Sequence, residues 1–201
     1  RFLSLYIHDG DKENQDKYFS TNLIFYIFLS LTVAVFGFFL VENVINFFSK
    51  SFSNTELEIL KALYYLTLIN IVWLLISGFF QGVLYAFEKF YIPKILNLTR
   101  IFLRSIFVFI ILYNGGKSIE MLIIDTLLNA LMLFVLILIV FNDVKVNFSF
   151  KSFDFKILYP TLKFSFWIFL GVLMDQFYWR TGSFVLGKYS NTNEIAIFVP
   201  S

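Results

Sequence analysis

The sequence predicts an all-α polytopic membrane protein, because its composition is strongly apolar and its apolar runs are long and nearly free of charge. Of the 201 residues, 59% are hydrophobic and only 15% are charged. A soluble domain of this size carries more polar residues, since they must cover its core. A helix needs roughly 20 apolar residues to cross the hydrocarbon core of a bilayer. Runs of about that length recur along the chain.

The first two predicted spans contain no charged residue. They are residues 21–41 and residues 62–87, and the second is longer than a span requires, so it is expected to tilt or to project from the membrane. Within it, Gly78 and Gly82 are four residues apart, a spacing that favours close helix packing. Gln81 and Asn70 on the same span are expected to form hydrogen bonds to neighbouring helices rather than to touch a substrate.

The three spans that follow carry charges within their apolar sequence. They are residues 95–113, 121–141 and 159–185, and a further apolar run begins near Glu194. The charges are Arg100 and Arg104 in the third span, Asp125 in the fourth, and Lys163, Asp175 and Arg180 in the fifth. We therefore expect five transmembrane helices and the start of a sixth.

Residues 142–158, between the fourth and fifth spans, break the helical pattern. Apolar residues from Val144 to Phe150 alternate with polar ones, as in a strand. A single strand would have no partner in this chain. We expect an extended or interfacial linker, with its aromatic residues toward lipid and its lysines toward anionic headgroups.

The distribution of lysine and arginine predicts the orientation. Successive spans alternate in direction, and the loops at one end hold nine of these residues against four at the other. The richer set is assigned to the cytoplasm. It comprises Arg1, Lys12, Lys17, Lys89, Lys94, Lys145, Lys151, Lys156 and Lys163, against Lys50, Lys61, Lys117 and Lys188.

Several kinds of chemistry are not expected. The chain has no cysteine, which excludes disulfides, thiol catalysis and cysteine metal sites. The single histidine, His8, lies in a polar run and is expected to be solvated, so no metal or other cofactor is predicted. No Gly-rich phosphate loop is present, and lysine and arginine do not cluster into a nucleic-acid-binding face.

Three groups of residues resemble those of a known transporter family. The first is residues 1–4 (RFLS) with the polar loop after it, and the second is residues 82–90 (GVLYAFEKF). The third is Asp175 followed by residues 184–189 (FVLGKY) and 193–198 (NEIAIF). Together they resemble the polysaccharide biosynthesis and O-antigen flippases of the MATE-like multidrug/oligosaccharidyl-lipid/polysaccharide (MOP) superfamily.

The resemblance implies a domain organisation and a function. Members have two helical bundles that alternate access to a central cavity. Residues 1–141 would be the last four helices of the first bundle, residues 142–158 a cytoplasmic linker, and residues 159–201 the start of the second, in a longer protein. The expected function is to flip an undecaprenyl-diphosphate-linked oligosaccharide across the bacterial inner membrane for O-antigen and lipopolysaccharide export, without enzymatic chemistry.

The expected partners are the lipid-linked oligosaccharide and membrane lipids, with other polysaccharide-assembly proteins as further candidates and no nucleic acid. Two alternatives stay open. One is a cation-coupled MATE-type drug exporter, which would favour an acid-lined cavity. The other is a membrane polysaccharide polymerase or glycosyltransferase, which would call for a long outer loop.

The intramembrane arginines are the first candidate site. Arg100 and Arg104 lie on one helix face and roughly 7 and 13 Å inside the predicted core. They can line the cavity and contact a lipid diphosphate, reach back to the headgroups, or pair with Glu88. Since Arg104 is deeper, it is expected to contribute more to transport.

The fifth span supplies the other candidates. Asp175 lies roughly 16 Å into the core, near the midplane. Arg180 is about 140° away around the helix, so the two should not pair. Asp175 either works in the cavity or holds the bundles in register through a static ion pair. Asp125, with Asn129 one turn on, is the other intramembrane acid, in a water-exposed vestibule or in a functional role.

Overall fold

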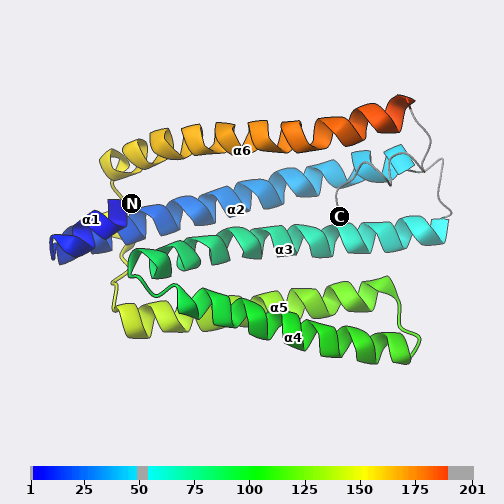
Figure 1. Ribbon diagram of the computed structural model, residues 1–201, viewed down its shortest axis with the longest axis horizontal. Helices are drawn as coiled ribbons and strands as arrows, with labels where there is room; N and C mark the ends of the chain where they lie inside the picture. The colour runs from blue at the N-terminus through cyan, green and yellow to red at the C-terminus, as the bar shows by residue number, and fades with distance from the viewer. Residues whose placement is uncertain (1, 49–53, 190–201) are drawn as a thin grey trace. The chain divides into compact units, whose positions relative to one another are not determined.

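The computed structural model describes residues 2–48 and 54–189, and from residue 179 onward the backbone alone. Its elements are predominantly α-helical, and no strand occurs in these two ranges (Figure 1). The helices are α1 (Phe2–His8), α2 (Lys12–Phe48), α3 (Asn54–Ala86), α4 (Tyr91–Tyr113), α5 (Ser118–Ile139) and α6 (Phe155–Tyr189). A π-helical turn, η1 (Val140–Val144), and a 3-10 turn, η2 (Phe150–Ser152), lie between α5 and α6.

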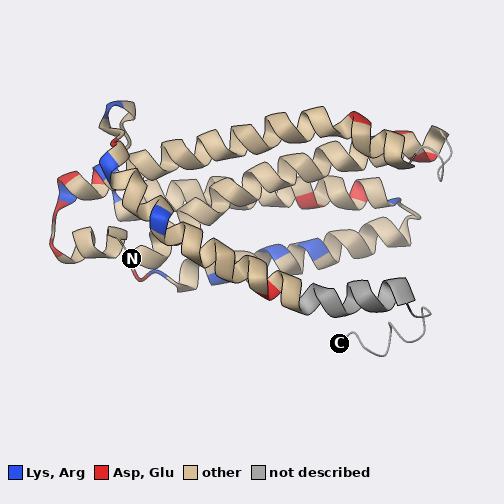
Figure 2. Ribbon diagram, turned by 90° about the horizontal axis from the view of Figure 1, so that it is seen from above, with Lys and Arg blue, Asp and Glu red and all other residues tan. Residues whose placement is uncertain are grey.

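Among the described residues, five helices are long and apolar enough to cross a membrane, which confirms the predicted class and its five spans. They cover Lys12–Phe47, Asn54–Ala86, Tyr91–Tyr113, Ser118–Val144 and Phe155–Tyr178. Long stretches along these helices carry no charge, as Figure 2 shows. The sixth span predicted to begin near Glu194 falls outside the described residues.

The chain divides into two compact units, residues 1–154 and residues 155–201. The boundary lies within the segment predicted as a linker. In the first unit α2 packs against α3, α3 packs against α5, and α4 packs mainly on α5. The second unit contains α6, in which Pro160 lies close to the N-terminal end.

A sharp turn joins the short helix α1 to α2. Gly10 has a φ of +69°, a conformation that glycine adopts without steric cost. Asp11 then caps α2, since its carboxylate accepts hydrogen bonds from the backbone and side-chain nitrogens of Asn14 at 3.0 and 2.6 Å. These bonds lower the pKa of the Asp11 carboxyl from its ordinary value. His8, at the end of α1, is exposed.

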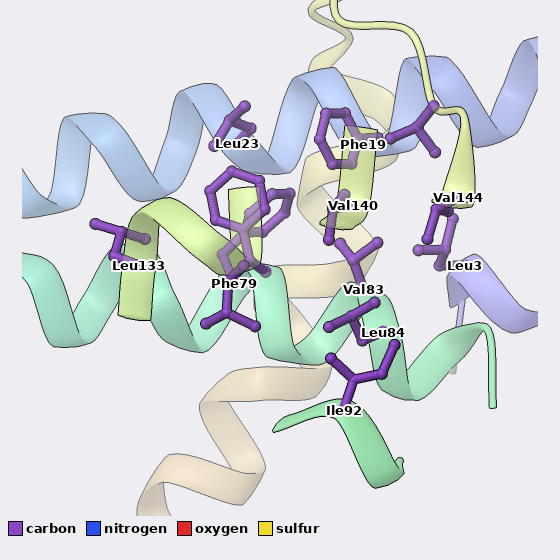
Figure 3. Packing of buried hydrophobic residues seen from close by; sticks show 13 residues of the cluster. Leu3, Phe19, Leu23, Phe79, Val83, Leu84, Ile92, Leu133, Val140 and Val144 are labelled. Carbon is purple, nitrogen blue, oxygen red and sulfur yellow. The ribbon is translucent and has the colours of Figure 1, made fainter. Parts of the chain in front are cut away.

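The apolar core of the first unit lies where the start of α2 meets the ends of α3 and α5 (Figure 3). Phe19 is fully buried there, and its ring centroid lies 5.3 Å from that of Phe79. Leu3 from α1 and Ile92 from the start of α4 join the same cluster. Five helices therefore converge at this end.

The segment after α5 packs back onto α2 through side-chain hydrogen bonds. Asp16 accepts bonds from the backbone and side-chain nitrogens of Asn147 at 2.9 and 3.0 Å. Ser20 donates to the carbonyl of Asn147 and accepts from the amide of Ser149. Thr21 donates to the carbonyl of Ser152 and accepts from the amide of Asp154. We call residues 147–154 the strap.

The apolar side chains around the strap differ in exposure. Val144 and Val146 are buried in the core. Phe148 is half-buried and packs against that core, whereas Phe150 is 75% exposed. The alternating pattern seen in the sequence thus separates buried valines from exposed lysines without forming a strand.

Glycine spacing does not mark the closest helix contact. A side chain at Gly37 of α2 would collide with Leu68 of α3, and the carbonyl of Gly37 accepts a 2.8 Å bond from the hydroxyl of Tyr64. At Gly78 and Gly82, by contrast, an added Cβ would meet nothing within 4 Å among the described residues. The expected close packing at these two glycines is therefore wrong for the described part of the chain.

Candidate functional site

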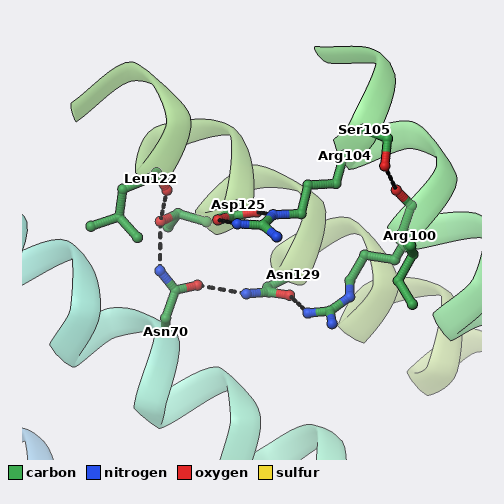
Figure 4. A network of polar contacts seen from close by, with 9 residues as sticks. Asn70, Arg100, Arg104, Ser105, Leu122, Asp125 and Asn129 are labelled. Atoms are coloured by element: carbon green, nitrogen blue, oxygen red, sulfur yellow. Dashed lines mark hydrogen bonds and ion pairs between the residues drawn. The ribbon is translucent and has the colours of Figure 1, made fainter. Parts of the chain in front are cut away.

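Two intramembrane arginines of α4 face two polar residues of α5 (Figure 4). Arg104 forms a bidentate ion pair with Asp125, from its Nε to Oδ1 at 2.5 Å and from its Nη2 to Oδ2 at 3.0 Å. The side chain of Arg104 is 54% exposed and that of Asp125 is 22% exposed. The carboxylate neutralises the arginine in a geometry that suits both groups.

Arg100, one turn earlier, has a different partner. Its Nη1 donates a 2.7 Å hydrogen bond to Oδ1 of Asn129, which is a neutral amide. No carboxylate lies within ion-pair distance of Arg100 among the described residues. The pairing with Glu88 left open by the sequence is not formed. Arg100 therefore keeps its full positive charge.

A chain of hydrogen bonds continues from Asn129 through α3. Its Nδ2 donates to Oδ1 of Asn70 at 2.7 Å, and Nδ2 of Asn70 donates to Oγ1 of Thr126 at 2.7 Å. Thr126 in turn donates to the carbonyl of Leu122 at 2.6 Å. The expectation that Asn70 bonds a neighbouring helix is confirmed. We call Arg100, Asn129, Asn70 and Thr126 the relay.

A cavity of about 530 Å³ lies between α3, α4 and α5 and reaches the relay. Its lining contains polar and aromatic residues and two cations, but no aspartate or glutamate. Representative lining residues are Trp73, Gln81, Tyr85, Lys94, Asn97 and Arg100. A second cavity of about 310 Å³ lies beside it and contains Arg100, Arg104 and Asp125.

The fifth-span candidates belong to the other unit. Asp175 lies on α6 with an exposed side chain. Arg180 is also on α6, and its side chain falls outside the described residues. The structure therefore brings together Arg100 and Arg104 of the four predicted site residues. No cluster of acidic residues and histidine suited to a metal ion occurs in the described ranges.

That the polar residues of α4 and α5 have the same spacing was not predicted from the sequence. Arg100 and Arg104 are four residues apart, as are Asp125 and Asn129. On adjacent antiparallel helices, two such pairs can meet in register, with the first of one pair opposite the second of the other. In the sequence Asn129 stands out only as a neighbour of Asp125, because its amide side chain is uncharged.

Comparison with known proteins identifies a family. The model of the family described as "Polysaccharide biosynthesis protein" matches residues 3–199. No curated protein and no solved structure matches the chain. Since the family match spans nearly every residue and agrees with the resemblance seen in the sequence, the chain belongs to the polysaccharide biosynthesis protein family.

Proposed function

We propose that this protein is a transporter rather than an enzyme, and that it flips an undecaprenyl-diphosphate-linked oligosaccharide across the bacterial inner membrane by alternating access. The observation that carries the proposal is the uncompensated charge of Arg100 in a cavity without acids, on a helix able to span a membrane. Export of polysaccharide such as O-antigen is the process it would serve.

The physical argument concerns the charge of the cargo. A diphosphate is costly to move through hydrocarbon unless a cation replaces part of its hydration. Arginine suits this task because its planar guanidinium can bind two phosphate oxygens at once. Lys94 lines the same cavity and adds a second positive charge.

The remaining lining suits a sugar. Asn97 and Gln81 offer amide donors and acceptors for hydroxyl groups, and Trp73 and Tyr85 offer aromatic surface. By the lysine distribution, the end of the cavity near Lys94 faces the cytoplasm, where a lipid-linked sugar would enter. A cation-coupled drug exporter would instead favour acids in the cavity, and the larger cavity has none.

The hydrogen-bond partners of Arg100 and Arg104 reverse the order of importance for transport that their depth alone predicts. Arg104 is deeper, but Asp125 neutralises it, whereas the charge of Arg100 is available to a ligand. We therefore expect Arg100 to contribute more to transport than Arg104.

The test is surface polysaccharide in a strain that lacks its own flippase. Arg100→Gln should lower polymer export at least about tenfold, which corresponds to a loss of about 1.4 kcal/mol in the rate-limiting step. The matched control is Arg104→Gln combined with Asp125→Asn, which removes two charges without changing the net charge and should retain most export. Equal export by both variants at equal protein abundance would contradict the proposal, as would drug efflux without polymer export.

A further inference from the structure

We infer that Asn129 is the residue that sets the anion selectivity of the cavity, because it holds Arg100 without neutralising it and so leaves that charge for a phosphate-bearing ligand. The inference rests on the proposed function and assigns a specificity role within that site. It also assigns to Asn70 the role of a positioning residue for Asn129.

The first step compares two neighbouring pairs that differ in one functional group. Arg104 faces a carboxylate and Arg100 faces an amide, one helical turn apart on the same two helices. The first pair has no net charge and the second has a charge of one. An anion in the cavity is therefore attracted chiefly by the second pair.

The second step is the direction of the hydrogen bonds, which Figure 4 shows. Arginine can only donate, so Asn129 must present its Oδ1 to Arg100. The Nδ2 of Asn129 is then directed at Oδ1 of Asn70, as observed. The amide of Asn70 is oriented in turn by its Nδ2, which donates to Thr126 and to the backbone carbonyl of Leu66. Asn70 thus keeps the amide of Asn129 in the orientation that Arg100 requires.

The third step concerns the N–H donors of Arg100 that remain after its bond to Asn129. A guanidinium carries five N–H groups, and among the described residues Arg100 uses its Nη1 toward Asn129. Its other donors are available to a ligand in the cavities that it lines. The ligand chemistry that fits is a phosphate or diphosphate oxyanion, which accepts several charge-assisted hydrogen bonds.

The decisive variant is Asn129→Asp, which has the same shape and gives Arg100 a carboxylate partner. It is expected to fold, because the relay can reverse its direction. The amide of Asn70 can turn to donate to the new carboxylate, and the hydroxyl of Thr126 can rotate to donate to Asn70. Each of these two side chains then gives up a bond to a backbone carbonyl of its own helix.

Binding of inorganic pyrophosphate to the purified protein in phosphatidylcholine nanodiscs measures the effect. We expect Asn129→Asp to weaken binding at least about tenfold and to reduce its dependence on salt, since the charge of Arg100 is then compensated and Lys94 alone remains cationic. Asp125→Asn, which frees the charge of Arg104, should keep or strengthen binding. A wild-type protein that binds no pyrophosphate, or an Asn129→Asp protein that binds it equally well, would overturn the inference.

Asn70→Ala is the second variant, and it changes no charge. It removes the acceptor that orients Asn129, so we expect pyrophosphate affinity to fall by about threefold with its salt dependence intact. A purely structural role for Asn70 would instead lower thermal stability and leave affinity unchanged, and that result would overturn the positioning role.

Two further arms separate the ligand source and the underlying function. If nanodiscs of phosphatidylglycerol block pyrophosphate binding, the oxyanion is supplied by a lipid headgroup; if they do not, the site prefers the diphosphate, and either result supports the site. Loss of polymer export in Asn129→Asp with unchanged pyrophosphate binding would overturn the inference alone. Pyrophosphate binding that changes as expected in a protein unable to restore export would instead overturn the proposed function.

Discussion

At the scale of single residues, identical side chains have different chemistry because their partners differ. Arg100 and Arg104 share a helix face, yet the ion pair with Asp125 removes the charge of one and the amide of Asn129 leaves the charge of the other. A charge inside a membrane is expensive when it faces lipid, and tolerable where it has a polar partner or faces a wet cavity. Both arginines meet this condition, because Arg104 has a carboxylate partner and Arg100 has an amide partner and lines a cavity.

Asp175 gives a prediction that separates its two candidate roles. If it only balances a buried cation, Asp175→Asn should lower folded abundance, since breaking a buried pair typically costs about 3 to 5 kcal/mol. If it works in transport, Asp175→Asn should fold normally and lose polymer export, while Asp175→Glu retains part of it. Quantitative blotting beside the export assay decides, and full export by Asp175→Asn at normal abundance would eliminate both roles.

Sequence predicts which residues are charged in the membrane and which of them share a face, but not their partners. The spacing of Arg100 and Arg104 and the periodicity of an α-helix suffice to predict that the two arginines share a helix face. The partners of the two arginines depend on which helix lies beside α4 and at what register. Packing between α3, α4 and α5 fixes both. Asn70 was predicted to bond another helix, but its position in a relay to Arg100 was not predictable.

At the scale of whole helices, length and contact are set by different residues. Helix α2 has 37 residues and so extends about 55 Å, well beyond a hydrocarbon core of about 30 Å. Hydropathy locates such a helix reliably because the penalty for burying charge in lipid is large. It does not locate the contacts, because lipid-facing and helix-facing positions are equally apolar, and the open glycines Gly78 and Gly82 illustrate this limit.

The contact between α2 and α3 gives the next prediction. Gly37→Val should force Leu68 to move and weaken this contact, with a loss of about 1 to 3 kcal/mol as for other overpacked sites. Adding Leu68→Ala should restore part of the lost thermal stability. Gly78→Val is the matched control, since a Cβ there meets nothing in the described part of the chain. Equal melting temperatures for Gly37→Val and Gly78→Val would contradict this account.

The strap can be tested through Ser20, whose hydroxyl bonds both Asn147 and Ser149. Ser20→Ala should cost about 1 to 3 kcal/mol, because two partners lose a hydrogen bond, and should speed hydrogen exchange in residues 147–152. Ser30→Ala is the control, since among the described residues the buried hydroxyl of Ser30 bonds only the carbonyl of Tyr26, in its own helix. Unchanged exchange in the strap of Ser20→Ala would show that these bonds do not hold it.

At the scale of the molecule, the apolar core of the first unit and the relay lie at different positions along the helices. The apolar core around Phe19 and Phe79 contains residues of all five helices from α1 through α5, and it lies near the turn that contains Lys89. Lys89 also lies 3.8 Å from a carboxylate oxygen of Asp143 and so ties the turn between α3 and α4 to η1. The relay lies farther along α4, beyond this core.

Topology is the prediction that belongs to this scale. Because these 201 residues contain no cysteine, a single cysteine introduced among them is the one thiol of this segment, and the unsubstituted protein serves as the labelling control. Cysteines replacing Lys50 and Lys117 should react with a membrane-impermeant maleimide at the outer face of intact cells, whereas those replacing Lys89 and Lys151 should react only after lysis. Labelling of position 151 in intact cells, with position 50 protected, would reverse the assigned orientation.

The reversible direction of the relay also has a genetic consequence. An asparagine codon and an aspartate codon differ by a single base, so one point mutation at position 129 would leave the cavity with one uncompensated cation instead of two. The surrounding hydrogen bonds would adapt by an amide turn and a hydroxyl rotation, at the loss of two bonds to backbone carbonyls. Cargo preference could therefore diverge between closely related strains while the helices and their packing stay the same.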